Sequence, residues 1–66
     1  MRITLNGVER EIEPGTSVAG LVALLGMRSD AVAVERNLEL VPRSRQAEVC
    51  LAEGDRVEVV TLVGGG

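Results

Sequence analysis

Two short runs of alternating polar and apolar residues open the chain and meet at Asn6-Gly7. Residues 2–5 alternate with the period of a strand that is buried on one face. Asn-Gly is the strongest short-range hairpin signal, because a type I′ turn needs positive φ at both central residues. Residues 8–12 supply the return strand. The chain is therefore predicted to begin with a tight antiparallel hairpin.

The return strand carries a charge among its apolar positions. Val8 and Ile12 share one face with Arg10, while Glu9 and Glu11 lie on the other. A long basic side chain can pack its methylene stem and keep its charged head in water. We therefore expect Arg10 near the edge of the sheet.

One helix is predicted after the hairpin. The apolar residues of 18–25 recur at i, i+3, i+4 and i+7, the stripe of a short amphipathic helix: Val18, Leu21, Val22 and Leu25. Thr16 or Ser17 is a suitable N-cap, and Gly26 is placed to end the helix. Gly20, in the helix interior, lowers the stability of the helix by up to about 1 kcal/mol relative to Ala. It is either a tolerated surface glycine or a point of close approach.

Three later runs predict the remaining strands. Residues 31–35 form a mostly apolar run that suits a central strand, and 38–41 form a short strand that ends at a proline. Residues 43–48 are polar and irregular, with room for one turn of 3₁₀ helix. A turn then leads into the final strand, residues 56–62.

The two faces of the final strand are both partly apolar. One face carries Val57 and Val59, and the other carries Glu58, Val60 and Leu62. A chain of 66 residues has a thin core, since it buries only about 60% of the surface that its unfolded form exposes. Such a core can hide one face, so the other is expected to form a shallow apolar patch on the surface.

The order of elements defines the fold class. Two strands, a helix that crosses over, and three further strands predict an α+β domain with a mixed four- to five-stranded sheet packed on one helix. This is the ubiquitin-like β-grasp architecture. We assign it to residues 1–63, and residues 64–66 to a flexible C-terminal tail of three glycines.

Charge and composition exclude several classes of function. Seven basic and ten acidic residues give 7 − 10 = −3, and no side chain is aromatic. Nucleic-acid binding is disfavoured, because it draws on backbone neutralisation and base stacking, whereas partners with basic surfaces fit. With no His and a single Cys, neither a zinc site nor an internal disulfide is expected, which fits a reducing cytoplasm. No membrane span or signal segment is recognisable.

Two further expectations concern chemistry within the domain. A domain this small has no space for a deep pocket, so we expect no catalytic residue and no bound cofactor. Cys50 lies between Val49 and Leu51, which should both return to the core. No His or Lys is present to lower its pKa, so Cys50 is interpreted as a small core residue or a bystander.

The whole chain resembles the sulfur carriers of the ubiquitin-like proteins, and most of all the ThiS-type carriers of thiamine biosynthesis. A terminal Gly-Gly directly after the last strand of a β-grasp domain is the most specific shared feature. Carriers of this type often have a Trp after Val-Pro-Arg, where this chain has Arg45 and Gln46. The resemblance rests on Ile3-Thr4-Leu5-Asn6-Gly7, the helix, Ala33-Val34-Glu35, Val41-Pro42-Arg43, the run from Glu53 to Val60, and Val63-Gly64-Gly65-Gly66.

The resemblance implies a function that resides in the tail. A ThiF-type, E1-like adenylyltransferase would use Mg-ATP to adenylate the Gly66 carboxylate. A sulfur donor such as a cysteine desulfurase would then allow conversion to a thiocarboxylate, which a ThiG-type thiazole synthase consumes. Gly65 and Gly64, which have no Cβ, would let the tail thread a narrow tunnel. The carrier itself would be a protein cosubstrate and not an enzyme.

The exposed face of the last strand is the predicted docking surface for these partners. Val60 and Leu62 are candidate anchors, and Glu58 and Asp55 are candidates for pairing with basic partner residues. Three alternatives stay open at this point: a sulfur carrier for tRNA 2-thiolation or molybdopterin synthesis, a ubiquitin-like protein modifier, and a regulatory module with an idle tail.

Overall fold

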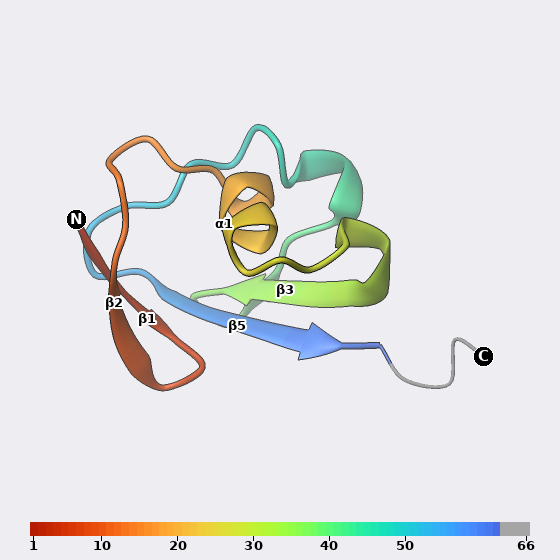
Figure 1. Cartoon of the computed structure of the whole chain (residues 1–66), viewed down its shortest axis with the longest axis horizontal. Helices are drawn as coiled ribbons and strands as arrows, with labels where there is room; N and C mark the ends of the chain where they lie inside the picture. The colour runs from red at the N-terminus through yellow and green to blue at the C-terminus, as the bar shows by residue number, and fades with distance from the viewer. Residues whose placement is uncertain (63–66) are drawn as a thin grey trace.

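The structure is a computed structural model that describes residues 1–62 (Figure 1). Its five strands form one sheet in the order β2-β1-β5-β3-β4. The predicted mixed sheet packed on one helix is confirmed. The elements are β1 (Arg2–Leu5), β2 (Val8–Glu11), α1 (Val18–Leu24), the 3₁₀ turn η1 (Ser29–Ala31), β3 (Val32–Arg36), β4 (Glu39–Leu40), the 3₁₀ turn η2 (Arg43–Arg45) and β5 (Arg56–Thr61).

The last strand lies at the centre of the sheet. β5 runs parallel to β1 on one side and antiparallel to β3 on the other, while β2 and β4 form the two edges. The helix α1 lies over one side of the sheet, and no second helix of the described chain covers the opposite side (Figure 1). The sheet therefore has a helix-covered face and an open face.

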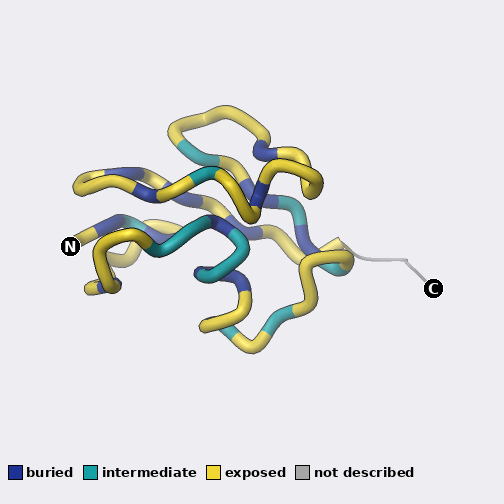
Figure 2. Tube along the Cα trace, turned by 90° about the horizontal axis from the view of Figure 1, so that it is seen from above, coloured by how far each residue is buried: buried dark blue, intermediate teal, exposed yellow. Residues whose placement is uncertain are grey.

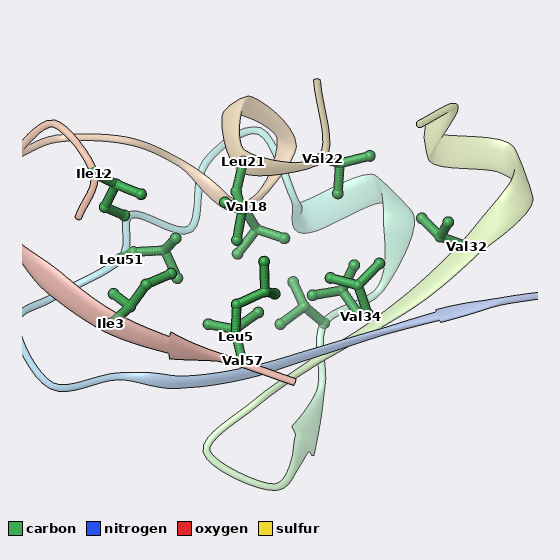
Figure 3. Close-up of a cluster of buried hydrophobic side chains, with 12 residues drawn as sticks. Ile3, Leu5, Ile12, Val18, Leu21, Val22, Val32, Val34, Leu51 and Val57 are labelled. Atoms are coloured by element: carbon green, nitrogen blue, oxygen red, sulfur yellow. The ribbon is translucent and has the colours of Figure 1, made fainter. Parts of the chain in front are cut away.

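A purely aliphatic core fills the space between sheet and helix (Figure 3). Figure 2 shows buried and exposed residues alternating along the strands, as expected for a sheet with one buried face. Each fully buried Val or Leu contributes about 1.5–3 kcal/mol of transfer free energy. The core residues are Ile3, Leu5, Ile12, Val18, Leu21, Val22, Val32, Val34, Val41, Leu51, Val57 and Val59.

Both ends of α1 carry the predicted caps. Ser17 is the N-cap, and its side-chain oxygen accepts a hydrogen bond of 3.0 Å from the Gly20 N–H. A Cβ on Gly20 would lie 3.3 Å from that oxygen, so the glycine leaves room for the cap. At the C-terminal end Gly26 has φ +73°, and the Met27 N–H donates to Val22 O at 3.2 Å. This bond belongs to a Schellman motif, which satisfies carbonyls that the helix end leaves free.

The predicted hairpin turn is confirmed, and the side chain of Asn6 also bonds to the backbone of β5. Asn6 and Gly7 have φ of 49° and 83°, the positive pair that a type I′ turn requires. The Asn6 side chain also accepts from the Val59 N–H at 2.9 Å and donates to the Val59 carbonyl at 3.2 Å. Its amide therefore takes the place of a β1 residue beside β5, just where β1 ends.

Asn6→Ala is expected to destabilise the domain by about 1–2 kcal/mol, since it removes two hydrogen bonds and places Ala at positive φ. Chemical denaturation and amide exchange at Val59 measure the effect. Asn6→Gly separates the two causes, because Gly tolerates the turn but cannot bond Val59. Unchanged exchange at Val59 in both variants would contradict this role.

The second strand differs from expectation. Every residue of β2 is exposed, and Val8, predicted to be on the apolar face, is 61% exposed. The reason is that β2 is an edge strand, and the core draws its strand residues from β1, β3 and β5. Arg10 is exposed at this edge, as predicted.

Other element boundaries shift by one or two residues. Ala31 belongs to η1 and not to a strand, the short strand comprises only Glu39–Leu40, and β5 ends at Thr61. Leu51 is buried and Val49 packs partly against the core, as predicted.

Candidate functional site

Buried and exposed residues alternate along β5, as its sequence predicts. Val57 and Val59 are buried in the core at 0% and 8% exposure. Glu58 and Val60 point to the open face and are exposed, and Leu62, just after β5, is exposed as well. The three predicted docking residues therefore lie together on the surface, close to where the described chain ends.

Neighbouring strands extend this surface. In the register of the sheet, Ala33 of β3 is paired with Val60, and Glu35 of β3 with Glu58. Leu40 of β4 is paired with Glu35. Because paired residues share a face, all of these side chains lie on the open side. We call this set the open-face patch: Ala33, Glu35, Leu40, Glu58, Val60 and Leu62.

The open-face patch combines exposed apolar and acidic groups. Val60, Leu62 and Leu40 are 58%, 54% and 64% exposed. Large apolar side chains gathered on one side of a small domain mark a contact surface more often than isolated ones do. The parity of the final strand identified three members of the patch from sequence. Ala33, Glu35 and Leu40 were missed, because assigning them requires the pairing of β3 with its neighbours.

Asp55, which the sequence offered as a partner contact, is a structural residue instead. It is 6% exposed, and its Oδ2 lies 2.7 Å from Arg36 Nε. The Ala52 N–H donates to Oδ2 at 2.8 Å, and Asn37 Nδ2 donates to Oδ1 at 3.1 Å. Burial by itself would raise the pKa of Asp55, but the hydrogen bonds from Ala52, Arg36 and Asn37 outweigh it, so the pKa is lowered. This carboxylate is fully engaged within the fold.

The other residues and features considered in the sequence have different outcomes. Cys50 is exposed, so its interpretation as a core residue is wrong and the bystander interpretation stays. Gly64, Gly65 and Gly66 lie outside the described residues, as does the predicted boundary at residue 63. Residues 1–62 contain no group of three metal-ligating side chains. Within the same range no helix is both long and apolar enough to cross a bilayer.

A five-stranded β-grasp domain whose last, central strand runs toward a glycine-rich end defines the class of small ubiquitin-like proteins. Within this class the sequence matches the ThiS family over residues 3–66. The chain belongs to the ThiS family.

Individual relatives agree with this assignment. The sulfur carrier protein ThiS of Bacillus subtilis is 35% identical over 65 residues, covering 97% of this chain and 98% of that protein. The crystal structure of the thiamine biosynthesis protein ThiS from Geobacter metallireducens superposes with a TM-score of 0.86 at 29% identity, covering all of both chains.

A second group of relatives is much longer. A thiazole synthase of Paramagnetospirillum magneticum is 46% identical over all 66 residues, but these make up 20% of that protein. A thiazole synthase of Magnetococcus marinus shows the same identity and the same share. The chain thus spans about one fifth of the length of these relatives.

Proposed function

We propose that the chain is a sulfur carrier for the synthesis of the thiamine thiazole. Its Gly66 carboxylate is adenylated and then converted to a thiocarboxylate. The observation that carries the proposal is family membership over residues 3–66, which reaches the terminal glycine. The carrier protein of Bacillus subtilis supports the role in sulfur transfer, and the thiazole synthases that contain a homologous segment support the acceptor pathway.

The proposed chemistry activates a poor electrophile. A Gly66 carboxylate oxygen attacks the α-phosphorus of ATP and displaces pyrophosphate, which leaves an acyl adenylate. A persulfide sulfur then attacks the acyl carbon, and AMP leaves with the electrons of the C–O bond. A second thiol breaks the resulting S–S bond and frees the thiocarboxylate. The partner adenylating enzyme supplies Mg-ATP and the catalytic groups, so the chain acts as a cosubstrate.

The domain contributes delivery and recognition to this scheme. Glycines have no Cβ, so residues 64–66 can enter a site too narrow for other residues. The open-face patch includes Glu58 and Val60 of the strand that leads to them, and it offers apolar anchors for a contact of modest size. Successive partners, first the adenylating enzyme and then a ThiG-type synthase, would use the same face in turn.

The test is intact-mass spectrometry after incubation with the cognate E1-like adenylating enzyme, Mg-ATP and a cysteine desulfurase with cysteine. We expect the mass gain that corresponds to exchange of one oxygen for sulfur, located by fragmentation at Gly66. Adducts through lysine isopeptide bonds would instead favour a protein modifier. A native chain that continues past Gly66, with no free carboxylate at that glycine, would contradict the proposal.

Cys50→Ser is expected to leave the rate of thiocarboxylate formation within about twofold of wild type, because the exposed thiol lies outside the proposed chemistry. The same mass assay, sampled over time, measures this rate. A loss of thiocarboxylate in Cys50→Ser with an unchanged unfolding midpoint would instead make Cys50 a sulfur relay.

A further inference from the structure

Two carboxylates lie opposite each other on the open face. Glu35 of β3 and Glu58 of β5 are partners in the antiparallel register, and both are exposed. Like charges directly opposite in a sheet destabilise the strand pair. Neither glutamate forms an ion pair within residues 1–62. The pair therefore costs the isolated domain stability.

The other end of the same face shows how two carboxylates can be neutralised. Arg2 Nη1 lies 3.4 Å from Glu9 Oε1, and Arg2 Nη2 lies 3.4 Å from Glu11 Oε1. One guanidinium can contact two carboxylates because it presents several N–H donors in a planar fork. At one end of the open face Arg2 therefore pairs with two glutamates. At the other end Glu35 and Glu58 face each other without an arginine between them.

The nearest arginines, Arg36 and Arg56, do not pair with Glu35 or Glu58. Arg36 follows Glu35 in the chain but faces the helix side, where it binds Asp55. Arg56 lies two residues before Glu58 on the same strand, yet it forms no ion pair within the described chain. Within residues 1–62, Glu35 and Glu58 therefore have no cationic partner, and a partner protein could supply one.

We propose that the open-face patch binds a partner surface whose arginine inserts between Glu35 and Glu58. The proposal rests on the proposed function and commits to one partner, the adenylating enzyme. The exposed side chains of Val60, Leu62 and Leu40 would form the apolar border of this contact. When they exclude water, the attraction between the guanidinium and both carboxylates becomes stronger than at an open surface. A compact lysine ammonium would span two carboxylates less well.

The test is Glu35→Gln/Glu58→Gln, assayed by pyrophosphate release with the cognate adenylating enzyme and Mg-ATP. The KM for the carrier should rise at least about tenfold, because a desolvated charge pair is lost, while kcat stays within about twofold. The unfolding midpoint should rise by about 1–4 °C, because the like-charge pair is removed. A merely structural role would not raise stability while weakening binding.

Glu9→Gln/Glu11→Gln is the matched control, since it removes the same charge from the same face where Arg2 already neutralises it. Its KM should stay within about twofold of wild type, and its unfolding midpoint should not rise. An equal rise of KM in both double variants would show a general charge effect and overturn the inference.

The remaining outcomes separate this inference from the function on which it rests. If wild type is adenylated and Glu35→Gln/Glu58→Gln keeps the wild-type KM, the inference alone fails. If wild type with a free Gly66 carboxylate releases no pyrophosphate, the proposed function fails and the inference fails with it.

Discussion

A Gly65→Val variant should lose thiocarboxylate formation by at least about a hundredfold, because a misplaced reacting group costs that much in an oriented reaction. The branched Cβ of Val narrows the accessible φ and ψ and adds bulk beside the terminal residue. The core should be unaffected, since Val59 is its last member within residues 1–62. Intact-mass spectrometry measures the product, and thermal unfolding checks the fold.

Graded variants test the same idea at finer resolution. Gly65→Ala should give an intermediate loss, because it adds one methyl group without branching. Gly64→Ala should lose less than Gly65→Ala, since it lies further from the reacting carboxylate. Normal thiocarboxylation of Gly65→Val would refute the threading role of this residue.

Asp55→Asn should cost about 2–3 kcal/mol of folding free energy, because it removes a buried charge and leaves Arg36 without its counter-ion. One amide cannot accept from Arg36, Asn37 and the Ala52 N–H as the carboxylate does. Urea denaturation at neutral pH measures the loss. A matched control is Asp30→Asn, because Asp30 also pairs with an arginine but at an exposed site. It should cost far less.

The same variant predicts a pH dependence. The pKa of Asp55 is lowered in the folded state, because its hydrogen bonds outweigh the effect of burial. Its contribution is therefore complete above the unfolded pKa of about 3.9 and is lost as pH falls through the folded value. The difference in stability between wild type and Asp55→Asn should accordingly shrink in acid. A constant difference from pH 7 down to pH values of about 2 would contradict this assignment.

Local signals in the sequence predicted much of the fold. The Asn6-Gly7 turn, the capped helix and the parity of β5 each depend on residues close together in the chain, and the structure confirms all three. Pairing between distant segments was harder to predict. The ion pair of Asp55 joins residues 19 apart in the sequence, so its charge looked available to a partner.

In the candidate site, too, local patterns could be predicted from sequence and long-range pairing could not. Glu58, Val60 and Leu62 followed from alternation along one strand, which has a fixed period of two. The opposition of Glu35 and Glu58 depends on the register between β3 and β5, and a shift of one residue would place Glu35 on the other face. Alternation within each strand does not determine that register.

The central position of β5 also determines how the domain responds to force. If a partner drew the C-terminus into its site, as proposed above, a pull along the axis of this strand would load β5 directly. β5 is bonded on both sides, to β1 and to β3, by hydrogen bonds that run across the direction of pull. Under such a load the bonds resist together in shear and do not open one after another. A pull on the C-terminus would therefore not detach β5 from the sheet one hydrogen bond at a time.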